Sequence, residues 1–201
     1  APTKAFAIIG FGKLGGLELG PGSDLDIVFL HDLDEDHSRF LHRVVRRLLH
    51  MLTTRTHSGA LYDVDTRLRP SGRAGTMVSS LAAFEQYQQH DAWTWEHQAL
   101  VRARPVAGDA HVCAAFQRIR RDILCRVRDR ARLREEILDM RRRIGESAGA
   151  GVDVKRERGG IVDIEFMVQY LVLASAAEHP SLADWTDNVR ILGAAAETGL
   201  L

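Results

Sequence analysis

The most constraining feature of this sequence is a glycine-rich stretch that lies between two short apolar runs. The stretch GFGKLGGLELGPGSD covers Gly10–Asp24; it follows the β-forming run Phe6–Ile9 and precedes a second apolar run, Leu25–His31. Because glycine and proline interrupt regular structure, this pattern predicts a strand, a loop and a second strand. Any chemistry in this region must therefore be built on a loop between two strands.

Two standard phosphate-binding loops do not fit this stretch. The spacing of Gly10, Gly12 and Gly15 resembles a dinucleotide-binding fingerprint, but only nine residues follow Gly15 before the second strand. A parallel crossover needs a dozen or more residues. A Walker A loop requires Ser or Thr after its lysine, whereas Lys13 is followed by leucine. The sequence therefore argues against both a Rossmann domain and a P-loop.

Two carboxylates stand where the loop meets the second strand. In an extended segment Asp24 and Asp26 project to one side, while the alternate apolar residues point into the core. Neighbouring carboxylates repel each other unless a cation neutralises them, and Mg²⁺ favours one or two carboxylates together with waters and phosphates. The glycine-rich loop offers backbone N–H groups to an anion, and Lys13 adds a positive charge. The alternative is an ordinary loop end that caps an edge strand.

A third strand is predicted over Ala60–Leu68, before the breakers Pro70 and Gly72. One face of this strand would carry two acids and two arginines: Leu61, Asp63, Asp65, Arg67 and Arg69. Acids beside arginines suit a metal ion and a polyphosphate that lie across the strand. A solvated edge strand would show the same alternation, so this alternative stays open for the segment taken alone.

The three carboxylates suggest one kind of chemistry. Asp24, Asp26 and Asp65 could hold two divalent metal ions about 3.5 to 4 Å apart, as in-line phosphoryl or nucleotidyl displacement requires. One metal would activate the attacking hydroxyl group, and the other would stabilise the leaving pyrophosphate. Asp65 would bind the first metal and could accept the hydroxyl proton. Spacing alone does not identify the acceptor molecule.

Helices are predicted among the strands of the first half, and beyond Gly108 the pattern is helical alone. Helices are predicted over Phe40–Leu52, from Ser79 or Ser80 to His90, over Trp93–Val101, in one or two long segments beyond Gly108, over Ile161–Ala177 and over Asp187–Glu197. Gly145–Gly151 is predicted to be a linker. We therefore expect an α+β protein: an α/β nucleotidyltransferase core with a mixed sheet over residues 1–108, followed by an all-helical bundle over residues 109–201.

Composition limits the possible partners and compartment. Lys and Arg total 27 and balance 27 Asp and Glu, so no overall field favours nucleic acid or an anionic membrane. The arginine excess in Ala110–Glu146 lacks interleaved aromatic residues and is expected to be a solvated helix face or a docking surface for an acidic partner. Cys113 and Cys125 are too few for a disulfide framework, and no apolar run approaches the length of a membrane span. We expect a cytoplasmic protein.

Four segments, in order, resemble successive signatures of glutamine synthetase adenylyltransferases: GFGKLGGLELGPGSDLDIVFLHD, LYDVDTRLRPSGRAGTM, AWTWEHQALVRARPVAGD and KRERGGIVDIEFMVQYLVL. That family belongs to the polymerase-β-like nucleotidyltransferases. Its full-length members carry two similar halves, one that attaches AMP to a tyrosine of glutamine synthetase and one that removes it by phosphorolysis. Trp93–Gln98 and Asp163–Glu165 look more like the transferring half.

The resemblance implies roles for particular residues. Asp24 and Asp26 would be the metal-binding pair and Asp65 the third carboxylate, with Mg²⁺ or Mn²⁺ as the metal. The ATP triphosphate would be held by the following residues: Gly12, Lys13, Gly15, Ser23, Arg67 and Arg69. Contacts with the substrate or with the metal ligands would come from the following residues: Trp95, Glu96, Lys155, Asp163 and Glu165. Acids at a helix start and large aromatic residues also have ordinary structural roles.

The resemblance also implies partners. Glutamine synthetase would be the protein substrate, and a PII-type signalling protein would bind the full-length enzyme; neither nucleic acid nor a membrane is expected. Two alternatives remain. One is the phosphorolytic, adenylyl-removing half of the same family. The other is an inert regulatory domain that binds nucleotide or a PII-type protein, and the retention of Asp24, Asp26 and Asp65 speaks against it.

Overall fold

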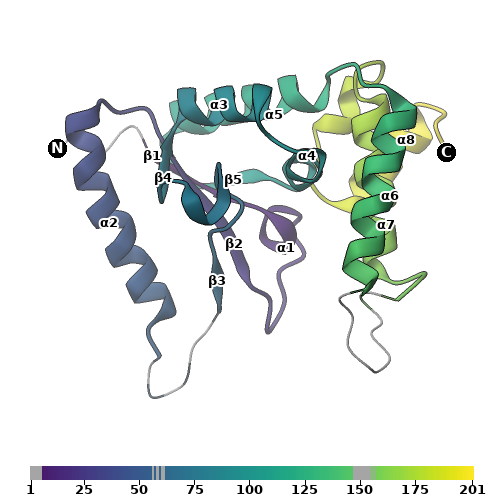
Figure 1. Ribbon diagram of the computed structural model, residues 1–201. Helices are drawn as coiled ribbons and strands as arrows, with labels where there is room; N and C mark the ends of the chain where they lie inside the picture. Colours follow the sequence, from purple (N-terminus) through teal and green to yellow (C-terminus); the bar gives the residue numbers. More distant parts are fainter. Residues whose placement is uncertain (1–5, 56, 58, 60–61, 147–154, 156) are drawn as a thin grey trace. The chain divides into compact units, whose positions relative to one another are not determined.

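The computed structural model describes residues 6–55, 57, 59, 62–146, 155 and 157–201 (Figure 1). Its residues divide into two compact units. The first combines Ala1–Ala92 with Arg102–Arg120, and the second combines Trp93–Val101 with Arg121–Leu201. The sequence predicted a boundary near residue 108. In the structure, residues 109–120 group with the first unit, and Trp93–Val101 groups with the second. No helix in the described ranges is long and apolar enough to cross a membrane.

The first unit contains a five-stranded mixed sheet. Its strands are β1 (Phe6–Gly10), β2 (Leu25–His31), β3 (Val64–Asp65), β4 (Val78–Ser80) and β5 (Arg104–Gly108). Strand β1 pairs antiparallel with β2 and with β5, while β3 and β4 both pair parallel with β2. Direct antiparallel pairing of the first two strands confirms the argument against a Rossmann unit, in which they would be parallel. The mixed sheet was predicted, and it is confirmed.

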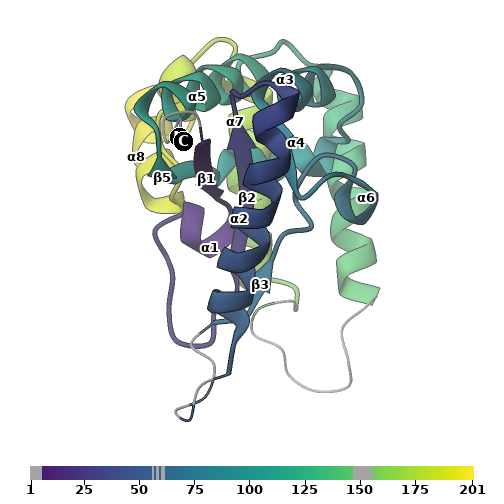
Figure 2. The same ribbon diagram turned by 90° about the vertical axis from the view of Figure 1, so that its left-hand side faces the viewer.

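Strand β2 is the centre of the core of the first unit. Its residues from Ile27 onward are buried, and Ile27 and Phe29 pack with Leu41 and Val45 of α2 (Glu35–Thr53). Phe6 stacks on Phe29 with ring centroids 5.9 Å apart. Full burial of such side chains contributes about 1.5–3 kcal/mol each. Figure 2 shows α2 running alongside the sheet. This burial fixes the position of Ile27–His31. Asp24 and Asp26 lie just before this buried segment, at the less buried end of β2.

Two helix starts are set by capping side chains. The Ser80 hydroxyl accepts the Ala83 N–H at 3.2 Å and begins α3 (Leu81–His90), as predicted. The Asp34 carboxylate accepts the His37 N–H at 3.1 Å and begins α2, five residues earlier than the predicted start. A carboxylate that satisfies a first-turn N–H stabilises the helix end. The acidic turn of the sequence is therefore the first turn of α2.

The third strand is shorter than the predicted Ala60–Leu68. Strand β3 contains only two residues, and the chain then turns; Ala60 and Leu61 lie outside the described residues. Ser71 has φ 59° and Gly72 has φ 53°, backbone values that belong to turns. The expected row of acids and arginines on one strand face is therefore wrong for the arginines. Arg69 is instead buried, and it donates to the Thr66 carbonyl at 2.7 Å.

The second unit is helical, as predicted. It contains α4 (Thr94–Val101), α6 (Arg130–Glu146), α7 (Ile161–Ser175), the short 3₁₀ helix η2 (Pro180–Ala183) and α8 (Asn188–Glu197). Helix α7 contacts α4, α6 and α8. Its buried Gln169 accepts a hydrogen bond through Oε1 from Gln98 Nε2 of α4 at 2.9 Å, which pairs a donor and an acceptor away from water. Residues 147–151 of the predicted linker lie outside the described residues.

The helical pattern beyond Gly108 is divided between two helices, α5 (Ala110–Leu124) and α6. Arg128 marks the end of α5, because its guanidinium donates to the carbonyls of Ile123 at 2.7 Å and Leu124 at 3.1 Å. These carbonyls have no partner in the next helical turn. Burial lowers the pKa of Arg128 to about 10. Val127, which fitted the apolar periodicity, lies in the turn and is 90% exposed.

Candidate active site

The acidic residues lie at neighbouring ends of β2 and β3. In the parallel register Asp26 is the partner of Asp65, and the Leu25 N–H donates to the Asp63 carbonyl at 2.7 Å. Paired residues of adjacent strands project to the same face of a sheet, and so do residues two apart on one strand. The backbone therefore places Asp24, Asp26 and Asp65 on one face at one end of the sheet.

The glycine-rich loop lies directly against this acidic end. The Phe11 N–H donates to the Asp26 carbonyl at 2.8 Å. Gly12 has φ 54°, and a Cβ atom there would lie 2.5 Å from Asp26 Oδ2. Both the backbone conformation and this close approach require glycine. Gly12 thus begins α1 (Gly12–Gly15) in contact with the Asp26 carboxylate.

Two arginines that the sequence analysis missed hold this loop. Arg104 of β5 donates to the carbonyl oxygens of Leu14 and Gly15, each at 3.1 Å. A Cβ atom on Gly15 would lie 1.9 Å from the Arg102 carbonyl oxygen, so only glycine fits there. Buried Arg102 also pairs with Glu18 at 2.5 Å. The only signal in the sequence was the tripeptide RAR before a proline. Two arginines at this spacing do not by themselves show which groups they would bind.

The loop also brings Lys13 and Ser23 together. Lys13 Nζ donates to Ser23 Oγ at 3.5 Å, and the same hydroxyl oxygen accepts the Gly20 N–H at 3.2 Å. Ser23 is buried, whereas Lys13 is exposed. A mobile ammonium group on a fixed loop is a suitable arrangement for contacting phosphate. The predicted loop residues are therefore close in space beside the acidic end of the sheet.

Asp65 is engaged by Arg67. The Arg67 N–H donates to Asp65 Oδ1 at 2.8 Å, and Arg67 Nε reaches Oδ1 at 3.0 Å and Oδ2 at 2.7 Å. These hydrogen bonds are the main reason that the pKa of Asp65 is lowered. The pKa of Arg67 is raised, mainly by Asp65 and further by the charges of Asp26 and Asp24. One guanidinium therefore interacts electrostatically with all three carboxylates.

A cavity of about 470 Å³ opens beside these residues. It is lined by Asp24, Asp63, Val64, Asp65, Thr66, Arg67, Arg69 and Arg73. Arg73 was not among the predicted site residues, and its charge also lowers the pKa of Asp65. Among the described residues, no three His, Cys, Asp or Glu side chains are grouped as ligands for a metal ion. The backbone thus assembles the three acids, while the Asp65 side chain is turned to Arg67.

The remaining predicted site residues belong to the second unit. The buried Glu96 carboxylate accepts the Trp93 N–H at 2.9 Å and so caps the start of α4. Trp95 is 38% exposed on the same helix. The Lys155 carbonyl accepts a backbone hydrogen bond at 3.1 Å at the start of α7, and Glu165 is half-buried on that helix. These contacts are structural, and roles for these residues in the reaction stay predictions.

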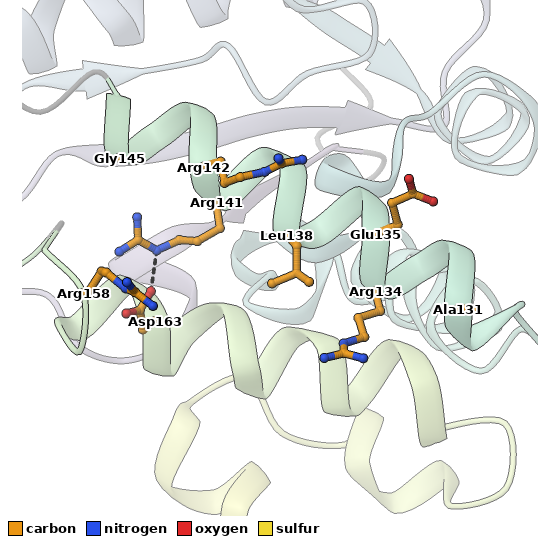
Figure 3. Close-up of a pocket in the computed structure, with 9 residues that line it drawn as sticks. All are labelled: Ala131, Arg134, Glu135, Leu138, Arg141, Arg142, Gly145, Arg158 and Asp163. Carbon is orange, nitrogen blue, oxygen red and sulfur yellow. Dashed lines mark hydrogen bonds and ion pairs between the residues drawn. The ribbon is translucent and has the colours of Figure 1, made fainter.

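Asp163 lies at the edge of a second cavity, of about 950 Å³ (Figure 3). Its carboxylate pairs with Arg141 of α6 and accepts the Gly159 N–H at 2.6 Å. The cavity is lined by Ala131, Arg134, Glu135, Leu138, Arg141, Arg142, Gly145, Arg158 and Asp163. Arg141 also donates to the Glu157 carbonyl at 3.2 Å. Asp163 therefore joins α6 to the segment that leads into α7.

This chain is similar to one described protein family and to several named relatives. Residues 1–119 match the protein family described as glutamate-ammonia ligase adenylyltransferase. Relatives from Thioalkalivibrio sulfidiphilus, Pseudomonas putida and Hahella chejuensis are 57%, 52% and 50% identical over 98%, 93% and 97% of this chain. Each is named bifunctional glutamine synthetase adenylyltransferase/adenylyl-removing enzyme.

Each match covers nearly all of this chain but only a small part of the relative. The chain spans only 22% of the length of each of these relatives. The family match covers more than half of the chain, including the glycine-rich loop and all three carboxylates. This chain therefore belongs to the glutamate-ammonia ligase adenylyltransferase family.

Proposed function

We propose that this chain transfers AMP from ATP to a tyrosine hydroxyl of glutamine synthetase and releases pyrophosphate, and thereby controls nitrogen assimilation. The observation that carries the proposal is the parallel register that pairs Asp26 with Asp65, next to a glycine loop held against the Asp26 carboxylate. Three carboxylates on one face beside an anion-binding loop suit nucleotidyl displacement. The names of the relatives supply the protein substrate.

The donor set fits Mg²⁺ or Mn²⁺. Asp24, Asp26 and Asp65 would hold the metal ions through carboxylate oxygens, the ligand type that hard divalent cations prefer. Bound metal would supply charge stabilisation for the attacking hydroxyl and the leaving pyrophosphate. Within the protein, the absence of a side chain at Gly12 leaves room for the Asp26 carboxylate, and Arg102 and Arg104 hold the loop in place. Asp65 is the residue proposed to accept the hydroxyl proton.

The chain would bind the nucleotide through its first unit. Lys13 and Ser23 lie together on the loop, and their ammonium and hydroxyl groups suit phosphate oxygens. Arg67 lines the cavity beside Asp65 with an exposed guanidinium. Arg69 is committed to Thr66 and Gly75, so its contribution would be to hold the turn that carries Arg67. Gly15 would contribute by its fit against Arg102.

The direction of the reaction rests on resemblance. The names of the relatives include both attachment and removal of AMP. Trp93–Gln98 and Asp163 resemble the transferring half, which supports transfer over phosphorolysis. The two halves would use equivalent carboxylate sites and the same metal chemistry, so direction would depend on which protein surface docks and which anion enters. A PII-type signalling protein is the proposed regulator of the full-length enzyme.

The test is an assay in both directions with the full-length protein that contains this chain, after inactivation of its other nucleotidyltransferase half. With α-labelled ATP, Mg²⁺ and unmodified glutamine synthetase, we expect a labelled AMP-tyrosine adduct and pyrophosphate. With adenylylated glutamine synthetase and orthophosphate, we expect little ADP. Efficient ADP release without adduct formation would overturn the transferase assignment in favour of the adenylyl-removing activity.

A further inference from the structure

We propose that Arg67 is an internal counter-ion of the three carboxylates Asp24, Asp26 and Asp65. Its guanidinium pairs with Asp65 before a metal ion binds and leaves Asp65 when the metal ion binds. The proposal rests on the proposed function, because it concerns the same three carboxylates. In the proposed function, Arg67 only contacts the nucleotide. The new step is an exchange of anionic partners, in which the guanidinium leaves the Asp65 carboxylate and binds a phosphate of the nucleotide.

The geometry of the Asp65–Arg67 contact carries the first part of the argument. The carboxylate accepts the backbone N–H of Arg67 and two side-chain groups, Nε and Nη2, so both of its oxygens are engaged. A carboxylate held in this bidentate way has its most favourable lone pairs directed at the guanidinium. Metal ligation through Asp65 therefore requires that the side-chain contact be broken or rotated away.

The Asp65–Arg67 contact explains why the backbone brings the three acids to one face while their side chains do not converge on one point. Register places Asp26 and Asp65 opposite each other, yet no metal-ligand group of three acidic, His or Cys side chains exists within the described residues. Three carboxylates on one face repel one another when no cation is present. The Arg67 charge compensates for this repulsion in the metal-free protein, and a divalent ion would compensate more strongly.

Exposure makes Arg67 suitable for such an exchange. Its side chain is 64% exposed, whereas that of Asp65 is 21% exposed. An ion pair between residues two apart whose arginine is exposed contributes little to stability, so it can break without disturbing the fold. Arg69 in the same cavity is unsuitable, because it is buried and bound to the Thr66 hydroxyl and carbonyl. The released Arg67 would remain at the cavity, where a phosphate would meet it.

The test measures metal and nucleotide binding separately in the full-length protein, after inactivation of its other nucleotidyltransferase half. Mn²⁺ binding is followed by electron paramagnetic resonance without nucleotide, and ATP binding by calorimetry at saturating Mg²⁺. We expect Arg67→Gln to bind Mn²⁺ about twofold to fivefold more tightly than the wild type, because a competing cation is lost. The same variant should bind ATP more weakly. Opposite signs for the two affinities are the signature of an exchanged counter-ion.

Arg73→Gln is the matched control, since Arg73 lines the same cavity and affects Asp65 through its charge rather than by a hydrogen bond. Its effect on Mn²⁺ affinity should be clearly smaller. Arg67→Lys retains the charge but not the bidentate contact, and should give an intermediate Mn²⁺ affinity. If Arg67→Gln fails to fold, Arg67→Lys supplies the comparison, and an affinity equal to that of the wild type overturns the proposal.

Two further outcomes separate this proposal from the proposed function. Unchanged or weaker Mn²⁺ binding in folded Arg67→Gln overturns the counter-ion role while leaving the metal site intact. If the wild type binds no Mn²⁺, or if Asp24→Asn binds it as the wild type does, the metal site itself is wrong and both proposals fall. Neither measurement uses glutamine synthetase, so the identity of the protein substrate does not affect the result.

Discussion

The two units each contain an aspartate–arginine pair beside a cavity, and the pairs differ in what they connect. Asp65 and Arg67 are two residues apart on one short turn, and Arg67 is 64% exposed. Asp163 and Arg141 are separated by 22 residues, and Arg141 is only 16% exposed. The first pair is a local contact at the end of a strand. The second joins two helical segments of the second unit.

The same chemistry therefore has different consequences in the two places. A local pair with an exposed arginine contributes little to stability and can exchange partners readily. A pair whose arginine is largely buried and joins distant segments costs more to break, because its partners lose hydrogen bonds that hold those segments together. Asp163 also holds the Gly159 N–H, which makes it part of the start of α7. We expect the first pair to affect ligand binding and the second to affect stability.

The largest expected effect tests the functional side of this comparison. Asp24→Asn or Asp26→Asn should lower the AMP-transfer rate by at least about a hundredfold, since loss of a metal ligand exceeds the effect of losing a residue behind the ligands. The fold should be retained, because the wild-type carboxylates repel one another without metal. Transfer assays with circular dichroism on the same samples check this.

Asp32→Asn is the matched control for these variants. Asp32 follows the other end of β2, is exposed and pairs with His111 at 3.2 Å. Its replacement should leave the transfer rate near that of the wild type. A near wild-type rate in either Asp24→Asn or Asp26→Asn would instead contradict the assignment of these two residues to the metal.

The next effect tests the structural side. Arg141→Gln should lower the free energy of unfolding by about 1–3 kcal/mol, because Asp163 and the Glu157 carbonyl lose their donor. Arg67→Gln should lower it by clearly less, because the Arg67 guanidinium is exposed to water. Urea unfolding of both variants measures the difference. Equal losses would show that burial and sequence separation do not distinguish the two pairs.

The smallest effect concerns pH. The pKa values of Asp65 and Asp163 are lowered, mainly by hydrogen bonds from Arg67 and Arg141 respectively. A carboxyl group whose pKa is lower in the folded state stabilises the protein above its unfolded pKa, about 3.9, and this stabilisation is lost as pH falls through the folded-state value. Wild-type stability should therefore decline on acidification from about pH 5 downward.

Substitution of either acid should reduce that decline. Asp65→Asn and Asp163→Asn remove the titrating group, so the slope of unfolding free energy against pH below about 5 should become flatter in each variant. Chemical unfolding at several pH values between about 5 and 3 provides the measurement. An unchanged slope in Asp163→Asn would mean that its pairing with Arg141 does not persist in solution.

Much of the fold could be predicted from the sequence, because the relevant forces act between near neighbours. The glycine-rich stretch between two apolar runs indicated strand, loop and strand, and the short spacing excluded a parallel crossover. A helix was predicted to begin at Ser79 or Ser80, and in the structure the Ser80 hydroxyl accepts the Ala83 N–H and caps it. The period-two pattern also placed Asp24 and Asp26 on one face. Local backbone preference and side-chain periodicity are sufficient for such features.

Other features depended on contacts between residues distant in the sequence, and only the tertiary structure decided them. Parallel pairing of β3 with β2 brought Asp65 opposite Asp26, and β5 placed Arg104 against the Gly15 carbonyl. The turn after β3 buried Arg69, although alternation had placed it on an open strand face. Sequence patterns describe which way a side chain projects from its own element. Sequence patterns do not show which other element lies beside that element. The neighbouring element determines which polar groups meet.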